Sequence, residues 1–104
     1  MISVNVLYRH TDATKFNMNY YLDTHIPLVR KLLGPALKGV VVHQGIAGGA
    51  PGSPPEFTVI AELRFDSMES FQAAFAPHAP AVTGDIVNFT NVEPTIQFSD
   101  VRLG

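Results

Sequence analysis

The sequence contains no cysteine and few charged side chains, and both shortages limit its chemistry. Without cysteine, its 104 residues offer no disulfide bond, no thiolate nucleophile and no cysteine-ligated metal. Charged residues make up 15% of the chain and the formal net charge is −2, which argues against a nucleic acid partner. No apolar run approaches the length of a membrane span, and the first residues alternate like a strand rather than a signal peptide. We therefore expect a cytoplasmic protein that binds neither nucleic acid nor membrane.

The length of 104 residues suits one small domain, so we expect a single domain over residues 1–104. The hydrophobic fraction of 46% is ordinary for a soluble globule. A small domain with few charges is typical of a chain that buries part of its surface in an oligomer.

Apolar residues alternate with polar ones in three segments and valines cluster in a fourth, which predicts four strands. In the first segment Ile2, Val4, Val6 and Tyr8 share one face. The strands are expected over residues 2–8, 37–47, 57–65 and 95–101. The second and third are separated by a long loop rich in glycine and proline, which predicts an antiparallel hairpin.

Two helices are expected between these strands. Asn17 is a candidate N-cap of the first helix, where Phe16 and Tyr21 are spaced as a hydrophobic staple. Asp66 is the candidate N-cap of the second helix, with Glu69 reaching back to it as in a capping box. The resulting order of strands and helices is the ferredoxin-like βαββαβ plan, an α+β fold with both helices on one face of an antiparallel sheet.

The face of the sheet without helices is expected to mix polar and apolar side chains. Its members are Asn5, Leu7, Thr58, Ile60, Glu62, Arg64, Gln97 and Ser99. Such a face is too apolar to remain in water and too polar to form a core. We therefore expect a homodimer in which two sheets pack together as a barrel.

Residues 20–27, with the sequence Tyr-Tyr-Leu-Asp-Thr-His-Ile-Pro, hold the densest group of reactive side chains. Tyr21 and His25 are four residues apart and therefore share a helix face. Histidine is the side chain that most readily exchanges a proton near neutral pH. Pro27 lacks a backbone N–H, so the helix should bend beside His25. A proton-exchanging group at a bend predicts a pocket at this point.

Three segments of the chain resemble the EthD family of the dimeric α/β-barrel superfamily. They are residues 20–27, the strand exit Gly-Ile-Ala-Gly-Gly-Ala-Pro-Gly at 45–52, and the stretch from Phe71 to Ala79 that continues to Gly84 through Asn91. The three segments occur in the family's order and span nearly the whole chain. The resemblance implies a ferredoxin-like homodimer with a pocket for a small, mostly apolar molecule between the sheet and the helices.

The resemblance also implies a role in small-molecule catabolism, because the family is named for ethyl tert-butyl ether degradation alongside a cytochrome P450 system. Members are often labelled oxidoreductases, while superfamily relatives include cofactor-free monooxygenases, isomerases and lyases. The family's recurrent histidine corresponds to His25, and its Pro-His pair after the second helix corresponds to Pro77 and His78. The sequence has no nucleotide or flavin fingerprint, so no cofactor is expected.

The candidate catalytic residues are His25, as the proton-transfer group, and Tyr21, which is placed to hydrogen-bond the imidazole or a ligand. The candidate substrate-binding residues are Tyr8, Phe65, Phe75 and His78. Each also has a structural interpretation. In that interpretation His25 ties the bent helix to a backbone carbonyl, His78 caps a helix or lies at the surface, and most of the aromatic rings belong in a core. No metal is expected, because the histidines and carboxylates lack the spacing of a preformed site.

Two further groups of acidic and amide residues are interpreted as structural rather than functional. Asp23 is two residues from His25, so on a regular helix it faces elsewhere and is poorly placed to orient the imidazole. Asp85, Asn88 and Asn91 follow Gly84 and are typical of caps and turns. Three functions stay open at this point: an enzyme or auxiliary that uses proton transfer, a carrier of a hydrophobic molecule without turnover, and a haem-binding protein.

Overall fold

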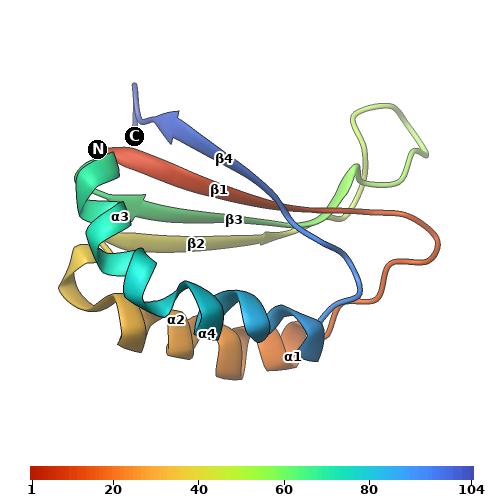
Figure 1. Cartoon of the computed structure of the whole chain (residues 1–104). Helices are drawn as coiled ribbons and strands as arrows, with labels where there is room; N and C mark the ends of the chain where they lie inside the picture. The colour runs from red at the N-terminus through yellow and green to blue at the C-terminus, as the bar shows by residue number, and fades with distance from the viewer.

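Helices cover one face of a four-stranded antiparallel sheet in the computed structural model, which describes all residues from Met1 to Gly104 (Figure 1). The strands are β1 (Ile2–Arg9), β2 (Gly39–Gln44), β3 (Phe57–Phe65) and β4 (Thr95–Asp100). The order across the sheet is β2-β3-β1-β4, with antiparallel pairing throughout. This is the ferredoxin-like α+β fold predicted from the sequence.

The helix-facing side of the sheet carries the predicted apolar residues. Val4 and Tyr8 of β1 are 3% and 2% exposed, and Val59 and Phe65 of β3 are completely buried. The register places Tyr8 opposite Val59 and Ile2 opposite Phe65. The period-two alternation therefore predicted the buried face of both central strands correctly.

The first helical segment runs from α1 (Met18–Tyr20) through a π-helical turn (Tyr21–His25) into α2 (Ile26–Leu33). Asn17 accepts a hydrogen bond from the Tyr20 backbone N–H at 3.0 Å, and the rings of Phe16 and Tyr21 lie 5.0 Å apart, which confirms the cap and the staple. The interruption expected at Pro27 takes the form of the π-helical turn, in which the Ile26 N–H bonds to the Tyr21 carbonyl.

The second helical segment consists of α3 (Met68–Phe75), a 3₁₀ turn (Ala76–His78), α4 (Ala79–Gly84) and a second 3₁₀ turn (Ile86–Asn88). Its N-cap is Ser67, whose Oγ accepts the Ser70 backbone N–H at 3.0 Å, so the prediction of Asp66 was wrong by one residue. Serine and aspartate cap helices about equally well, so composition alone does not distinguish these neighbours.

The opposite face of the sheet has no covering element (Figure 1). Ser99 Oγ donates to Asn5 Oδ1 at 2.6 Å across two strands, and His43 lies 3.3 Å from Glu62. Val41 on the same face is 40% exposed, and the buried Nε of Arg64 has no hydrogen-bond partner. The mixture of polar and apolar groups expected for this face is therefore present.

Candidate functional site

A cavity of about 740 Å³ lies between the sheet and the helices, and 17 of its 23 lining residues are hydrophobic. Its walls come from β1, β3, β4, the first helical segment, α3 and the stretch from Val82 to Pro94. The strand β4 forms one edge of the sheet, where Ile96 and Phe98 line the cavity and remain 48% and 46% exposed. The cavity therefore opens between β4 and the stretch from Val82 to Pro94, where Val87 is 81% exposed.

His25 lies in the cavity wall and is held by a carboxylate from the other helical segment. Its Nδ1 is 2.8 Å from Oδ2 of Asp85, and the two side chains are 6% and 12% exposed. A carboxylate accepts hydrogen bonds, so Nδ1 carries the hydrogen and Nε2 is the atom that gains or loses a proton. No protein group hydrogen-bonds to Nε2, and this nitrogen is not sealed from open space. The proton-exchanging atom is therefore available to a ligand.

Asp85 is fixed by two donors besides His25. The Tyr20 hydroxyl donates to Asp85 Oδ1 at 2.6 Å, and Asn88 Nδ2 donates to the same oxygen at 2.9 Å. Burial acts to raise the pKa of Asp85, but the hydrogen bonds from Tyr20, Asn88 and His25 and the charge of His25 outweigh it and hold the pKa below its usual value. The carboxylate is therefore ionised at neutral pH and orients the imidazole.

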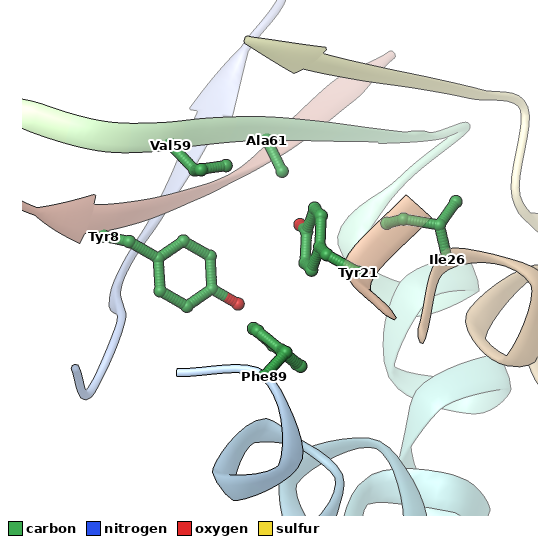
Figure 2. Close-up of a cluster of buried hydrophobic side chains, with 6 residues drawn as sticks. All are labelled: Tyr8, Tyr21, Ile26, Val59, Ala61 and Phe89. Atoms are coloured by element: carbon green, nitrogen blue, oxygen red, sulfur yellow. The ribbon is translucent and has the colours of Figure 1, made fainter. Parts of the chain in front are cut away.

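Tyr21 and Phe89 enclose the imidazole. The Tyr21 ring stacks on the His25 ring at 5.4 Å and 17°, and the Phe89 ring lies 4.6 Å away. The sequence predicts a hydrogen bond from Tyr21 to the imidazole or to a ligand; the contact with the imidazole is between ring faces. The Tyr21 hydroxyl instead turns toward Tyr8, whose ring lies 6.0 Å from that of Tyr21 (Figure 2).

Burial keeps both phenols protonated. It raises the pKa of Tyr21 to about 12, with a partly opposing effect from the nearby Tyr8 hydroxyl. Burial also raises the pKa of Tyr8, and the neighbouring Tyr21 adds to that rise. At neutral pH the pair is uncharged and retains a hydroxyl hydrogen that a ligand oxygen can accept.

The structure brings together most of the residues that the sequence nominated. Tyr8, Tyr21, His25 and Phe75 all line the cavity. Phe65 and His78 do not line it, because Phe65 is completely buried in the core and His78 is half-buried in the 3₁₀ turn after α3. These last two therefore have no contact with the cavity in this conformation.

Sequence reasoning missed Asp85 as the partner of His25. The two residues are 60 positions apart, so no spacing rule connects them. Aspartate after a glycine at a helix end is typical of a turn, and Asp85 does lie between α4 and a 3₁₀ turn. The available signal was its place in a stretch that resembles a known family.

The structure contains no group of three or more histidine, cysteine, aspartate or glutamate side chains arranged to hold a metal ion. None of its helices combines the length and the apolar character needed to cross a membrane.

Comparison with known proteins places the chain in a family. Residues 10–93 match the EthD domain. An EthD-like protein from Ralstonia eutropha JMP134, known from its crystal structure, shares 40% sequence identity with this chain. The two structures match with a TM-score of 0.94 over 98% of this chain and 92% of that one. An ethyl tert-butyl ether degradation (EthD) family protein from Bacillus halodurans C-125 is 26% identical with a TM-score of 0.73, covering 96% of this chain and 97% of that one.

A more distant structure shares the fold alone. A dimeric ferredoxin-like protein from Thermobifida fusca YX is 19% identical with a TM-score of 0.54, over 93% of this chain and 87% of that one. No curated protein matches the chain. The domain match over residues 10–93 and the identity to the Ralstonia protein show that the chain belongs to the EthD family.

Proposed function

We propose that this protein binds a small, largely apolar molecule in the cavity and moves a proton on it through Nε2 of His25. One observation carries the proposal: a histidine with its Nδ1 held by Asp85 lines a mostly hydrophobic cavity and leaves its other nitrogen without a protein partner. A buried histidine with a purely structural role would be expected to use both nitrogens on protein partners. Here Asp85 is held in turn by Tyr20 and Asn88, which is the support that a catalytic base needs.

The chemistry that fits this arrangement is proton abstraction from a carbon next to a carbonyl group, or from a phenol. Nε2 takes the proton, and the imidazolium that forms is stabilised by the ionised carboxylate of Asp85. Return of the proton to a different atom of the ligand completes an isomerisation without an external electron donor. Elimination uses the same first step and then breaks the bond from the neighbouring carbon to a leaving group, which departs with the bonding electrons. In a cofactor-free oxygenation the deprotonated ligand itself reduces dioxygen, gains one oxygen atom and releases the other as water.

Tyr8 and Tyr21 supply a second contact for the reacting group. Their hydroxyls lie at the same end of the cavity as His25, and both remain protonated at neutral pH because burial raises their pKa. A hydroxyl hydrogen from this pair, donated to the ligand oxygen, stabilises the negative charge that develops when His25 removes a proton. Phe75, in the wall formed by α3, contacts the apolar part of the ligand.

The second candidate function is a carrier that holds the same type of molecule without turnover. The hydrophobic lining and the opening beside β4 support it as well as they support an enzyme. The two functions differ in whether any ligand proton exchanges through His25.

We also propose that the protein is a homodimer that joins the uncovered faces of two sheets. The half-apolar character of this face supports the proposal, as does the unpartnered Nε of Arg64. The related fold from Thermobifida fusca is described as dimeric. A cytoplasmic location and a functional link to a cytochrome P450 system remain predictions.

The test is proton exchange in heavy water. Candidate ketones, lactones and phenols are incubated with the protein, and deuterium uptake at carbon is followed by mass spectrometry. We expect uptake by at least one compound, loss of uptake in His25→Gln, and full uptake in the control His10→Gln, whose ring bonds to Thr58 away from the cavity. Binding without His25-dependent exchange would favour the carrier, and a Soret band on adding haem would favour haem binding.

A further inference from the structure

The cavity is chemically different at its two ends. One end is formed by Tyr8 and Tyr21, which lie beside Phe89 (Figure 2), and by His25, whose ring is 4.6 Å from that of Phe89. The other is formed by Val29, Leu33, Phe71, Phe75 and Val82, which belong to a second hydrophobic cluster. Leu33 lies eight residues beyond His25 on the same helical segment, a rise of about 12 Å. The polar and apolar ends are therefore separated by about the length of a small molecule.

Few polar groups at the cavity are free to meet a ligand. The hydroxyl of Thr90 donates to the Lys15 carbonyl at 2.6 Å, and that of Thr83 donates to the Ala79 carbonyl at 2.7 Å. The amide of Asn91 donates to the Ala13 carbonyl at 2.9 Å. The free hydrogen-bonding capacity is therefore concentrated in Nε2 of His25 and the two phenols.

The charge around the cavity disfavours an anion. Its lining includes no lysine or arginine, and its one carboxylate side chain is that of the exposed Glu93. A second carboxylate, Asp85, lies directly behind His25. A carboxylate ligand would lose its hydration here and meet no lysine or arginine, only a histidine whose charge Asp85 already balances, and it would be repelled by both acidic groups. The polar end therefore suits an uncharged oxygen function.

The apolar end suits a hydrocarbon chain or ring. Phe71 and Phe75 stack at 5.1 Å and 15°, and Phe98 of β4 lies 5.3 Å from Phe71. These three rings form one continuous aromatic wall, since all of them line the cavity. Each methylene group of a ligand that reaches this wall leaves water for an apolar surface.

We propose that the substrate is an uncharged, elongated molecule with one hydroxyl or carbonyl group at the His25 end and a hydrocarbon portion that extends to Phe71 and Phe75. This inference rests on the proposed function, because it assumes that the reacting group lies at His25. It adds the orientation of the ligand, its lack of charge and the residues that select its length.

The experiment compares two matched series by isothermal titration calorimetry at neutral pH. The probes are 4-propyl-, 4-pentyl- and 4-heptylphenol, which are uncharged, and the corresponding 4-alkylbenzoates, which are anions. We expect affinity for the phenols to rise about fourfold per added methylene until the apolar end is full. We expect each benzoate to bind at least tenfold more weakly than the phenol of the same length.

Two variants locate the tail. Phe75→Trp narrows the apolar end, so it should shift the preferred phenol to a shorter chain and weaken 4-heptylphenol at least tenfold more than 4-propylphenol. The control Phe57→Trp changes a half-buried ring outside the cavity and should change no affinity. Circular dichroism of both variants establishes that they fold.

Three results would overturn the inference. Benzoates that bind as tightly as phenols would refute the lack of charge, and a length dependence unaffected by Phe75→Trp would refute the placement of the tail. Failure of every phenol to bind would refute the substrate class. None of these removes the proposed function, which fails separately if no compound exchanges deuterium through His25.

Discussion

Replacing Asp85 by asparagine tests the pair with His25 while preserving the size of the side chain. The charge is lost, and one accepting oxygen becomes an NH₂ group that cannot accept the hydrogen on His25 Nδ1. If the NH₂ group faces the ring, the imidazole changes tautomer, and Nε2 acquires the hydrogen and ceases to be a base. The variant therefore affects both stability and proton transfer.

The magnitude follows from the bond that is broken. The contact between Nδ1 and Asp85 is 2.8 Å long and mostly buried, and a hydrogen bond to a charged group contributes about 1.5–3 kcal/mol. We expect the free energy of unfolding to fall by about 2 kcal/mol, which for a domain of this size lowers Tm by roughly 8–16 °C. Loss of an oriented general base should slow deuterium exchange by about 10²- to 10⁴-fold.

The assays are thermal denaturation followed by circular dichroism and the exchange measurement in heavy water. Asp23→Asn is the matched control, because Asp23 lies in the same π-helical turn as His25 but is exposed. It should change the free energy of unfolding by less than about 0.5 kcal/mol and leave exchange unaffected. Equal effects of the two substitutions, or no effect of Asp85→Asn on either quantity, would refute the role of Asp85.

Further predictions concern pH, capping and assembly. The pKa of Asp85 is lower in the folded protein than in the unfolded chain, so its ionised carboxylate stabilises the fold fully above about pH 4, the pKa in the unfolded chain. This stabilisation is lost as pH falls through the folded pKa, and acid denaturation of Asp85→Asn should lack that loss. Because the pKa of Tyr21 is raised to about 12, stability should fall as pH rises from about 10 to 12, and Tyr21→Phe should weaken that fall in alkaline denaturation. Ser67→Ala should cost about 1 kcal/mol in urea denaturation, and Asp66→Ala clearly less; the reverse order would refute the cap assignment. Light scattering at micromolar concentration should show a dimer that Val41→Lys weakens, and a wild-type monomer would contradict the paired sheets.

The fold was predictable because its signals are local. Every second side chain of a strand points to the same face, so the apolar positions of β1 and β3 identified the side that faces the helices. Tyr8 and Val59 belong to these positions, and both are buried. Asn17 and its staple marked the start of the first helix, because a cap and the residues it bonds to lie within one turn. The error at the second helix was one residue, from Asp66 to Ser67, because both neighbours can cap.

The site was only partly predictable, since its key contacts are not local. His25 and Tyr21 were nominated from their spacing and from Pro27, but the partner of His25 lies 60 residues further along the chain. Tyr21 stacks on the imidazole within a π-helical turn, a geometry that the spacing rule for a regular helix does not describe. Phe65 was nominated as an aromatic cavity residue, but the sequence does not distinguish a ring that lines a cavity from one that fills the core.

Nitrogen NMR of the His25 ring tests the central claim most directly. In the neutral form, the account predicts a hydrogen on Nδ1, a bare Nε2, and a change in the Nε2 signal when 4-pentylphenol is added. A hydrogen on Nε2 in the neutral form, or an Nε2 signal that no ligand of the cavity perturbs, would contradict it.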